Sequence, residues 1–257
     1  MPRYVHFTHL GKRRWGRAEE SIIQPVEGNP FETDPVSVGQ PIPLAEIELH
    51  VPTQPTKIVC VGRNYQAHAA ELNNPVPKEP LLFLKPPSCL IAHKEAIEYP
   101  TGQSELVHHE GELAIVIGRR AKNVPMAKAF DVVRGYTILN DVTARDLQRR
   151  DVQFTRGKGF DTFGPCGPWI DTDFIPGEQA LEVSVNGEVR QKGLLSDMIF
   201  SPADLLARIS RIMTLEPGDI ISTGTPAGVG ALHPGDSVEV SIEGLGTLEN
   251  HVKHALA

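Results

Sequence analysis

The segment HHEGELAIVIG (His108–Gly118) sets two glutamates directly ahead of a run of Leu, Ala, Ile and Val. The apolar run predicts a buried strand, on which side chains two residues apart point to the same face. Glu110 and Glu112 are therefore expected side by side at the mouth of the strand, with Cβ atoms roughly 7 Å apart. A hard divalent cation such as Mg²⁺ would remove the repulsion and the desolvation cost of this pair. Two solvated acids at an ordinary strand end are the alternative interpretation.

The composition is that of an ordinary globular protein of 257 residues, with 40% hydrophobic and 22% charged residues. A formal charge of -7 argues against non-specific binding to nucleic acid, which needs many Lys and Arg contacts to phosphate. No apolar stretch is long enough to span a bilayer, and the N-terminal segment lacks the apolar core of a signal peptide. The sequence therefore predicts a cytoplasmic protein that is not associated with membranes.

Three cysteines, Cys60, Cys89 and Cys166, are odd in number, far apart and outside any CxxC pattern. This spacing favours neither a disulfide framework nor a zinc site built from thiolates. They are expected to be buried or incidental thiols.

The pattern along the chain predicts a β-rich α+β fold. Residues 1–52 carry short apolar stretches between Gly, Pro and Asn clusters, which indicate a small β-rich N-terminal domain, and residues 53–257 form the main domain. Strand patterns dominate the main domain, with a hairpin signal at Asn186-Gly187. An amphipathic helix is predicted over 201–213, capped by Ser201, and a polar one over 142–153.

More polar residues follow the acidic pair. Asp141 ends an apolar strand pattern, where it is either a helix cap or a third carboxylate beside the pair. Arg145 and Gln148 are three residues apart and share a helix face. Lys158 lies in a Gly- and Pro-rich segment, residues 156–170, that predicts a shaped loop. Near a metal, these side chains would bind an anionic substrate or a developing oxyanion.

His68 and Glu71 follow another strand, three residues apart on a short helical piece. A carboxylate at this spacing can hold the imidazole and raise its basicity, which suits a base that activates water. A histidine and a glutamate on the protein surface are the alternative.

Six motifs, in order and spacing, resemble the fumarylacetoacetate hydrolase superfamily over about residues 57–252. They are GRNYQAHAAE, FLKPPS, HHEGELAIVIG, NDVTARDLQ, KGFDTFGPCGPW and DIISTGTPAGVG. The resemblance implies a mixed β-sandwich roll with an added N-terminal domain, assembled as a homodimer. Larger fumarylacetoacetases use a fourth carboxylate ligand, for which the sequence has no clear counterpart, so the chain is most similar to the smaller, three-carboxylate branch.

The resemblance also implies a role for each candidate residue. It implies Mg²⁺ or Mn²⁺ as the cofactor, a water-activating pair, a group of residues around the substrate and oxyanion, and a threonine near the substrate carboxylate. In that order the residues are Glu110, Glu112 and Asp141; His68 and Glu71; Lys158, Arg145 and Gln148; and Thr225. His108 and His109 are expected to be partners of the carboxylates rather than ligands, since oxygen donors suit a hard ion.

The expected substrate is a small 2-oxo or 2,4-dioxo acid, bound so that the metal stabilises an enolate. Hydrolysis of the C–C bond of acylpyruvates is favoured, because the complete His68–Glu71 pair exceeds what a simple decarboxylation needs. The alternatives are an isomerase of the 2-hydroxyhepta-2,4-diene-1,7-dioate type in aromatic catabolism, an oxaloacetate decarboxylase, and a non-catalytic dicarboxylate binder. A zinc hydrolase using His108 and His109 is disfavoured because neighbouring strand residues point to opposite faces.

Overall fold

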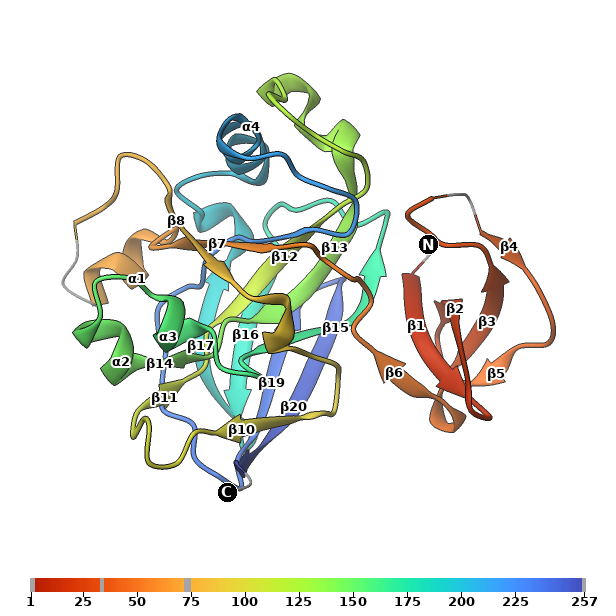
Figure 1. Ribbon diagram of the computed structural model, residues 1–257, viewed down its shortest axis with the longest axis horizontal. Coiled ribbons are helices and arrows are strands. Elements are labelled where there is room, and N and C mark those ends of the chain that lie inside the picture. Colours follow the sequence, from red (N-terminus) through yellow and green to blue (C-terminus); the bar gives the residue numbers. More distant parts are fainter. Residues whose placement is uncertain (1–2, 33–34, 72–74, 256–257) are drawn as a thin grey trace.

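The computed structural model describes residues 3–32, 35–71 and 75–255. The largest sheet has 13 strands, ten of them in the order β4-β3-β2-β1-β15-β13-β12-β18-β7-β8 (Figure 1). The other three pair with members of this series: β5 with β3, β6 with β1 and β9 with β15. Its strands are β1 (Arg3–His9), β2 (Lys12–Glu19), β3 (Ile22–Glu27), β4 (Val36–Ser37), β5 (Ile42–Pro43), β6 (Glu48–His50), β7 (Ile58–Gly62), β8 (Leu81–Lys85), β9 (Leu90–Ile91), β12 (Gly111–Ile117), β13 (Val133–Asn140), β15 (Gly164–Asp171) and β18 (Ile220–Ser222).

A second sheet of five strands packs against this one, and a two-stranded sheet lies near the helices α1 to α3 (Figure 1). The second sheet has the order β10 (Ala96–Tyr99), β20 (Gly246–His254), β19 (Ser237–Ile242), β16 (Ala180–Val185), β17 (Glu188–Leu194), and the small one pairs β11 (Val107–His108) with β14 (Thr143–Ala144). The helices are α1 (Gln66–Glu71), α2 (Arg145–Arg150), α3 (Thr155–Lys158) and α4 (Pro202–Ile212), with 3₁₀ turns at Leu44–Glu46, Pro87–Cys89, Met126–Val132 and Leu195–Asp197.

Strand β12 lies in the middle of the fold, and all seven of its residues are buried. Leu113, Ile115 and Ile117 on one face join the largest apolar cluster, whereas Ala114 on the other face joins a smaller one. Contacts of β12 and β13 with β16 and β19 close the sandwich between the two sheets. The expected β-rich α+β fold is therefore confirmed, and the strand that carries Glu112 is buried along its whole length.

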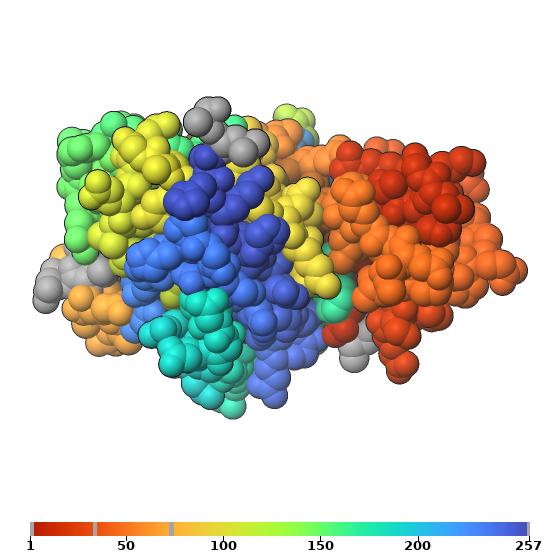
Figure 2. Space-filling model, turned by 90° about the horizontal axis from the view of Figure 1, so that it is seen from below, coloured from red at the N-terminus to blue at the C-terminus, as the bar shows by residue number. Residues whose placement is uncertain are grey.

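The N-terminal strands form a lobe at one end of the molecule (Figure 2). A small apolar cluster that includes Val5 and Phe7 holds the lobe together. It joins the main sheet through β1, which pairs with β15 so that Arg3 lies opposite Asp171. Arg3 Nε also donates to Asp171 Oδ2 at 3.0 Å. The β-rich character predicted for this region is confirmed, and its strands continue the sheet of the rest of the chain.

Two local predictions from the main domain are confirmed in detail. In α4, the Ser201 side chain accepts a hydrogen bond from the Asp204 N–H, and Leu205, Leu206 and Ile209 are buried. The hairpin β16–β17 turns at Asn186 and Gly187, which have φ of 53° and 80°. Two positive φ values in succession suit a two-residue turn of this composition.

Two other local predictions are wrong. The Gly- and Pro-rich segment 156–170 does not form a loop throughout, because its second half is β15, the strand that joins the N-terminal lobe to β13. Its ladder is irregular, with a register shift opposite 136–138 and a cis peptide bond at Gly167-Pro168, so its two prolines are accommodated without a regular strand pattern. The polar helix is shorter than 142–153, since Thr143–Ala144 pairs with β11 and α2 covers Arg145–Arg150 only.

All three cysteines are free and buried, as expected. Cys60, Cys89 and Cys166 share the smaller apolar cluster behind β12, and burial raises the pKa of all three thiols. Among the described residues, no helix has both the length and the apolar character needed to cross a membrane.

The close packing of β13 against β15 gives a test of the fold. A Cβ atom on Gly135 would lie 2.4 Å from the backbone oxygen of Asp171, which cannot move without shifting β15. We expect Gly135→Ala to lower the free energy of unfolding by about 2 kcal/mol, or Tm by roughly 5 °C, measured by thermal and urea denaturation. Gly177→Ala is the matched control, because its nearest neighbour is a side-chain oxygen of Gln179 at 3.6 Å. Equal stabilities of the two variants would contradict this account of the β13–β15 contact.

Candidate active site

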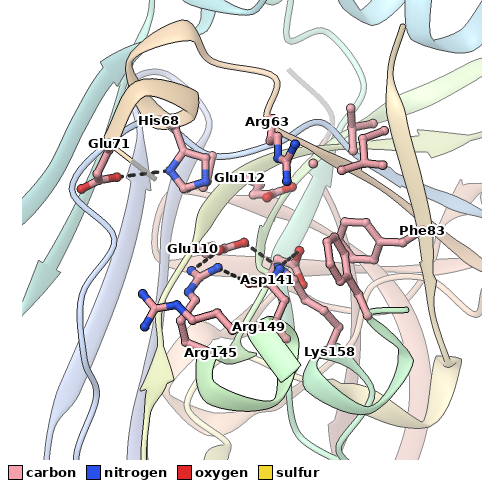
Figure 3. A pocket seen from close by; sticks show the side chains of 16 residues that line it. Arg63, His68, Glu71, Phe83, Glu110, Glu112, Asp141, Arg145, Arg149 and Lys158 are labelled. Carbon is pink, nitrogen blue, oxygen red and sulfur yellow. Dashed lines mark hydrogen bonds and ion pairs between the residues drawn. The ribbon is translucent and has the colours of Figure 1, made fainter. Parts of the chain in front are cut away.

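All nine residues singled out in the sequence line one cavity of about 420 Å³. Residues of the helices α1, α2 and α3 and of the start of β12 line this cavity, and Figure 3 shows their side chains. Its volume is within the usual range for small-molecule sites. The nine are His68, Glu71, Glu110, Glu112, Asp141, Arg145, Gln148, Lys158 and Thr225.

The three carboxylates of Glu110, Glu112 and Asp141 converge in this cavity. Each offers an oxygen that lies within 4.8 Å of the others, and all three residues are buried. The arrangement follows from the antiparallel register of β12 and β13, in which Gly111 lies opposite Asn140. The Asp141 N–H donates to the Glu110 backbone oxygen at 2.8 Å, so the third acid is placed beside the first two by the strand ends themselves.

Cationic side chains surround two of the three acids. Lys158 Nζ lies 2.6 Å from Glu110 Oε2 and 2.6 Å from Asp141 Oδ2. Arg145 makes an ion pair with the other oxygen of Glu110 and donates to Gln148 Oε1 at 2.6 Å. Figure 3 shows Arg145 and Lys158 on the same side of the acid cluster. These five side chains therefore form one connected polar group.

Lys85 is a member of this group that sequence reasoning missed. Its ammonium lies 2.8 Å from Asp141 Oδ1 and donates to the Val142 backbone oxygen at 3.1 Å, and the residue is 1% exposed. The signal was a charged residue in the otherwise apolar strand LLFLK. A lysine so deeply buried requires a partner, but the identity of that partner depends on the pairing of distant strands.

The environments of the two glutamates drive their pKa values apart. Burial alone would raise the pKa of Glu110, but the charges of Lys158 and Arg145 outweigh it and hold this pKa below its usual range. Burial, followed by the charges of Asp141 and Glu110, raises the pKa of Glu112 well above its usual range. Glu112 accepts hydrogen bonds only from Ser222 and from the Gly224 N–H, and no cation pairs with it among the described residues.

The donor set suits a hard divalent cation. Carboxylate oxygens are the preferred ligands of Mg²⁺ and Mn²⁺, and three of them converge here from two rigid strand ends. The surroundings of Glu112 test the fit, because this carboxylate is buried and has no cationic partner among the described residues. Metal ligands of this kind must be deprotonated, and a divalent ion would supply the missing charge.

His68 and Glu71 form the pair that their spacing predicts. His68 Nδ1 lies 3.3 Å from Glu71 Oε2, and the other carboxylate oxygen accepts from the Gly228 N–H at 3.0 Å. A carboxylate only accepts hydrogen bonds, so in the neutral form of the ring Nδ1 carries the proton and Nε2 keeps its lone pair. In Figure 3 the imidazole lies between Glu71 and the acid cluster.

The two histidines next to Glu110 do not partner the carboxylates, which corrects the expectation for them. His109 Nδ1 instead donates to Gln191 Oε1 at 2.8 Å, and burial lowers the pKa of both histidines, that of His108 to about 4. The Gln191 side chain also accepts from the Gly111 N–H at 3.2 Å and donates to Thr225 Oγ1 at 2.8 Å.

Gln191 is a second residue that sequence reasoning missed. It is fully buried and ties the start of β12 to the turn that carries Thr225, whose hydroxyl donates to the Gly111 backbone oxygen at 2.8 Å. Nothing in the local sequence distinguishes Gln191 from an exposed polar residue of a hairpin, because its role depends on the packing of β17 against β12.

Comparisons with known proteins show which families and structures the chain is similar to. Residues 57–253 match the family model described as fumarylacetoacetate hydrolase C-terminal, and residues 3–52 match one described as Rv2993c-like, N-terminal. The chain is 42% identical over 223 residues to the oxaloacetate tautomerase YisK of Bacillus subtilis, covering 81% of this chain and 74% of that protein.

Two solved structures are similar over nearly the whole chain. The crystal structure of 2-hydroxyhepta-2,4-diene-1,7-dioate isomerase from Mycobacterium marinum has a TM-score of 0.92 and 41% identity, and covers 100% of both chains. That of maleylpyruvate hydrolase from Sphingobium sp. SYK-6, in complex with a manganese(II) ion and pyruvate, has a TM-score of 0.83 and 30% identity, and covers 99% of this chain and 100% of that one.

The raised pKa of Glu112 predicts how the stability of the metal-free protein depends on pH. Its folded pKa lies above the ordinary value of 4.5, so its contribution to stability is present below that value and is lost as pH rises through the raised pKa. We expect Tm of the metal-free protein to fall as pH rises from 4.5 through the raised pKa of Glu112, and added Mg²⁺ to reduce this fall in Tm. In Glu112→Gln, whose amide oxygen still accepts from Ser222 and Gly224, that part of the fall is expected to vanish. Parallel curves of Tm against pH for the two proteins would contradict the assignment.

Proposed function

This chain belongs to the fumarylacetoacetate hydrolase family, and from that premise we propose a divalent-metal-dependent enzyme that moves protons at the carbon beside the carbonyl of a 2-oxo acid. Keto–enol tautomerisation of oxaloacetate, or the related shift of a double bond, is the first candidate reaction. The observation that carries the proposal is the convergence of Glu110, Glu112 and Asp141 beside Lys158 and Arg145.

Glu110, Glu112 and Asp141 would hold Mg²⁺ or Mn²⁺. When bound, such an ion acts as a Lewis acid that draws electron density from the 2-oxo group. Lys85 does not line the cavity, but its ion pair with Asp141 at 2.8 Å orients that carboxylate. This arrangement supports a rigid ligand set, since each of the three acids is held by at least one further hydrogen bond or ion pair.

His68 is the proposed base. Its Nδ1 is held by Glu71, which leaves Nε2 free to take a proton from C3 of the substrate. As that C–H bond breaks, its electron pair forms the enolate and negative charge develops on the 2-oxo oxygen. The imidazolium that results is stabilised by the Glu71 carboxylate, whose second oxygen is fixed by the Gly228 N–H. Return of this proton to the 2-oxo oxygen of the enolate gives the enol and restores the neutral imidazole.

Lys158 and Arg145 are the proposed donors to the developing negative charge. Both are almost fully buried, so their charges act in a medium of low polarity where charge-assisted hydrogen bonds are strong. Burial lowers the pKa of Lys158, but the negative charges of Asp141 and Glu110 outweigh burial and raise this pKa above its usual value. The side chain is therefore an ammonium ion. Gln148 and Thr225 line the same cavity and are proposed to orient the substrate carboxylate.

Hydrolysis of the C–C bond of acylpyruvates is the second candidate. The His68–Glu71 pair favours it, because a base backed by a carboxylate suits activation of water as well as removal of a C3 proton. In that case hydroxide attacks the 4-oxo carbon, the C3–C4 bond breaks, and the electron pair forms the same enolate. The maleylpyruvate hydrolase structure with manganese and pyruvate supports this alternative.

A homodimer, cytoplasmic location and a separate domain at residues 1–52 stay predictions.

Loss of one metal ligand is expected to abolish metal binding and activity together. In Asp141→Asn a neutral amide replaces one of the three carboxylates. We therefore expect the bound metal to be lost and the tautomerisation rate of oxaloacetate to fall by roughly 100-fold or more. Metal content by elemental analysis and enol formation by ultraviolet absorbance measure the two effects. Asp131→Asn, the same change at an exposed position outside the cavity, is the control. Full activity of Asp141→Asn without metal would refute the proposal.

Loss of the base is expected to slow the reaction without removing the metal. We expect His68→Ala to lower kcat by roughly 10²- to 10⁴-fold while metal content stays at the wild-type level. Glu71→Gln, which keeps a polar partner for the imidazole, is expected to show a smaller loss. Parallel assays with oxaloacetate and an acylpyruvate decide between the two candidate reactions, and an unimpaired His68→Ala in both would rule out His68 as the base.

A further inference from the structure

Gln191 is buried, whereas the other residues of β17 are exposed or half-buried. Its side chain does not line the cavity, but it contacts Thr225, which does. The same side chain contacts His109, Gly111 and Pro226. These four hydrogen bonds use the full capacity of a side-chain amide, whose oxygen accepts two and whose nitrogen donates two. A buried amide with every position filled is held in one orientation.

Two main-chain groups determine which end of this amide is which. The Gly111 N–H can only donate, and it lies 3.2 Å from Oε1 of Gln191. The Pro226 backbone oxygen can only accept, and it lies 2.8 Å from Nε2. The second hydrogen of Nε2 is therefore donated to Oγ1 of Thr225 at 2.8 Å.

The hydroxyl hydrogen of Thr225 is committed as well. Oγ1 lies 2.8 Å from the Gly111 backbone oxygen, which only accepts, so the hydroxyl donates there. Because Oγ1 also accepts from Gln191, it keeps one lone pair and has no hydrogen for a ligand. The main-chain N–H of Thr225 donates to no other group among the described residues. Thr225 therefore offers the cavity an acceptor on its side chain and a donor on its main chain.

This pair of groups matches one form of a 2-oxo acid. The nitrogen and Oγ1 of a threonine are attached to neighbouring carbons, as are the carboxylate and the 2-oxygen of the acid. A carboxylate oxygen at Thr225 can accept from the main-chain N–H, and the 2-oxygen then lies near the lone pair of Oγ1. In the keto form the 2-oxygen is a second acceptor and the contact is repulsive, whereas in the enol form it carries a hydrogen that can be donated.

We propose that Gln191 is a positioning residue that makes the Thr225 hydroxyl an acceptor towards the ligand, so that the site favours the enol form of a 2-oxo acid over the keto form. The inference rests on the proposed function, in that the substrate carboxylate lies at Thr225. Gln191 acts only through Thr225 and touches no part of the substrate. It biases the balance between the two tautomers in the site and takes no part in moving the C3 proton.

The test compares two stable ligands, pyruvate and lactate, which have the same carbon skeleton and differ in whether the 2-oxygen carries a hydrogen. Their Kd values are measured by NMR titration of the whole protein with Mg²⁺ present, for each enantiomer of lactate separately. The readout is the ratio of Kd for pyruvate to Kd for the tighter lactate. This ratio is expected to be roughly 3- to 10-fold higher in the wild type than in Thr225→Val, which has the same shape without the acceptor.

Further variants separate positioning from a structural role. In Gln191→Met the Thr225 hydroxyl is free to turn and donate to pyruvate, so the ratio is expected to fall towards that of Thr225→Val. Thr225→Ser keeps the hydroxyl with both of its partners and is expected to keep the wild-type ratio within about twofold. Gln103→Met, the same change at an exposed residue outside the cavity, is the control and is expected to keep the ratio as well.

A neutron structure of the deuterated wild type tests the same assignment without any substitution. The deuteron on Oγ1 of Thr225 is expected to point at the Gly111 backbone oxygen, and a deuteron directed into the cavity would overturn the proposal. If Gln191→Met does not fold, this map and the Thr225 variants decide.

The proposal is also overturned if Thr225→Val or a folded Gln191→Met keeps the wild-type ratio, as happens when a variant weakens both ligands equally. Because these measurements need no turnover, an inactive wild type whose ratio depends on Gln191 would refute only the proposed reaction. An active wild type whose ratio is the same in every variant would refute only the role of Gln191.

Discussion

Three buried carboxylates within 4.8 Å of one another are the constraint on which the rest of this structure depends. Their mutual repulsion and lost hydration require positive charge from several directions. Lys158 and Arg145 supply it from the side of α2 and α3, and Lys85 supplies it from β8. Glu112 remains the acid that no protein cation pairs with among the described residues, and its raised pKa marks the place of the missing charge.

The walls of the cavity are held by buried amides that touch no part of its interior. Gln191 connects β17 to the start of β12 and to the Thr225 turn, and Asn64 connects the end of β7 to the segment before α4. Each amide uses both its donor and its acceptor atoms, so each fixes two chain segments at once. Preorganised groups of this kind suit a site whose chemistry depends on directed charge.

The His68–Glu71 pair bears on the choice between the two candidate reactions. Sequence motifs alone favoured C–C hydrolysis, because the His68–Glu71 pair has the form of a water-activating base. The same pair would serve equally for proton removal at C3, and the relatives at 41–42% identity are a tautomerase and an isomerase. The proposed proton transfer and the alternative hydrolysis would share the enolate, so a single set of residues is compatible with both proposals.

The sequence by itself determined the features that depend on near neighbours. These include the adjacency of Glu110 and Glu112, the His68–Glu71 pair, the hairpin at Asn186 and the capped helix α4, since each follows from strand or helix periodicity over a few residues. Only the tertiary structure decided that Lys85 meets Asp141, 56 residues away along the chain, and that Gln191 meets His109, 82 residues away. It also made a strand of Gly164–Asp171, whose glycines and prolines oppose a strand locally. Partners from distant strands depend on sheet register, and local periodicity carries no information about register between distant segments.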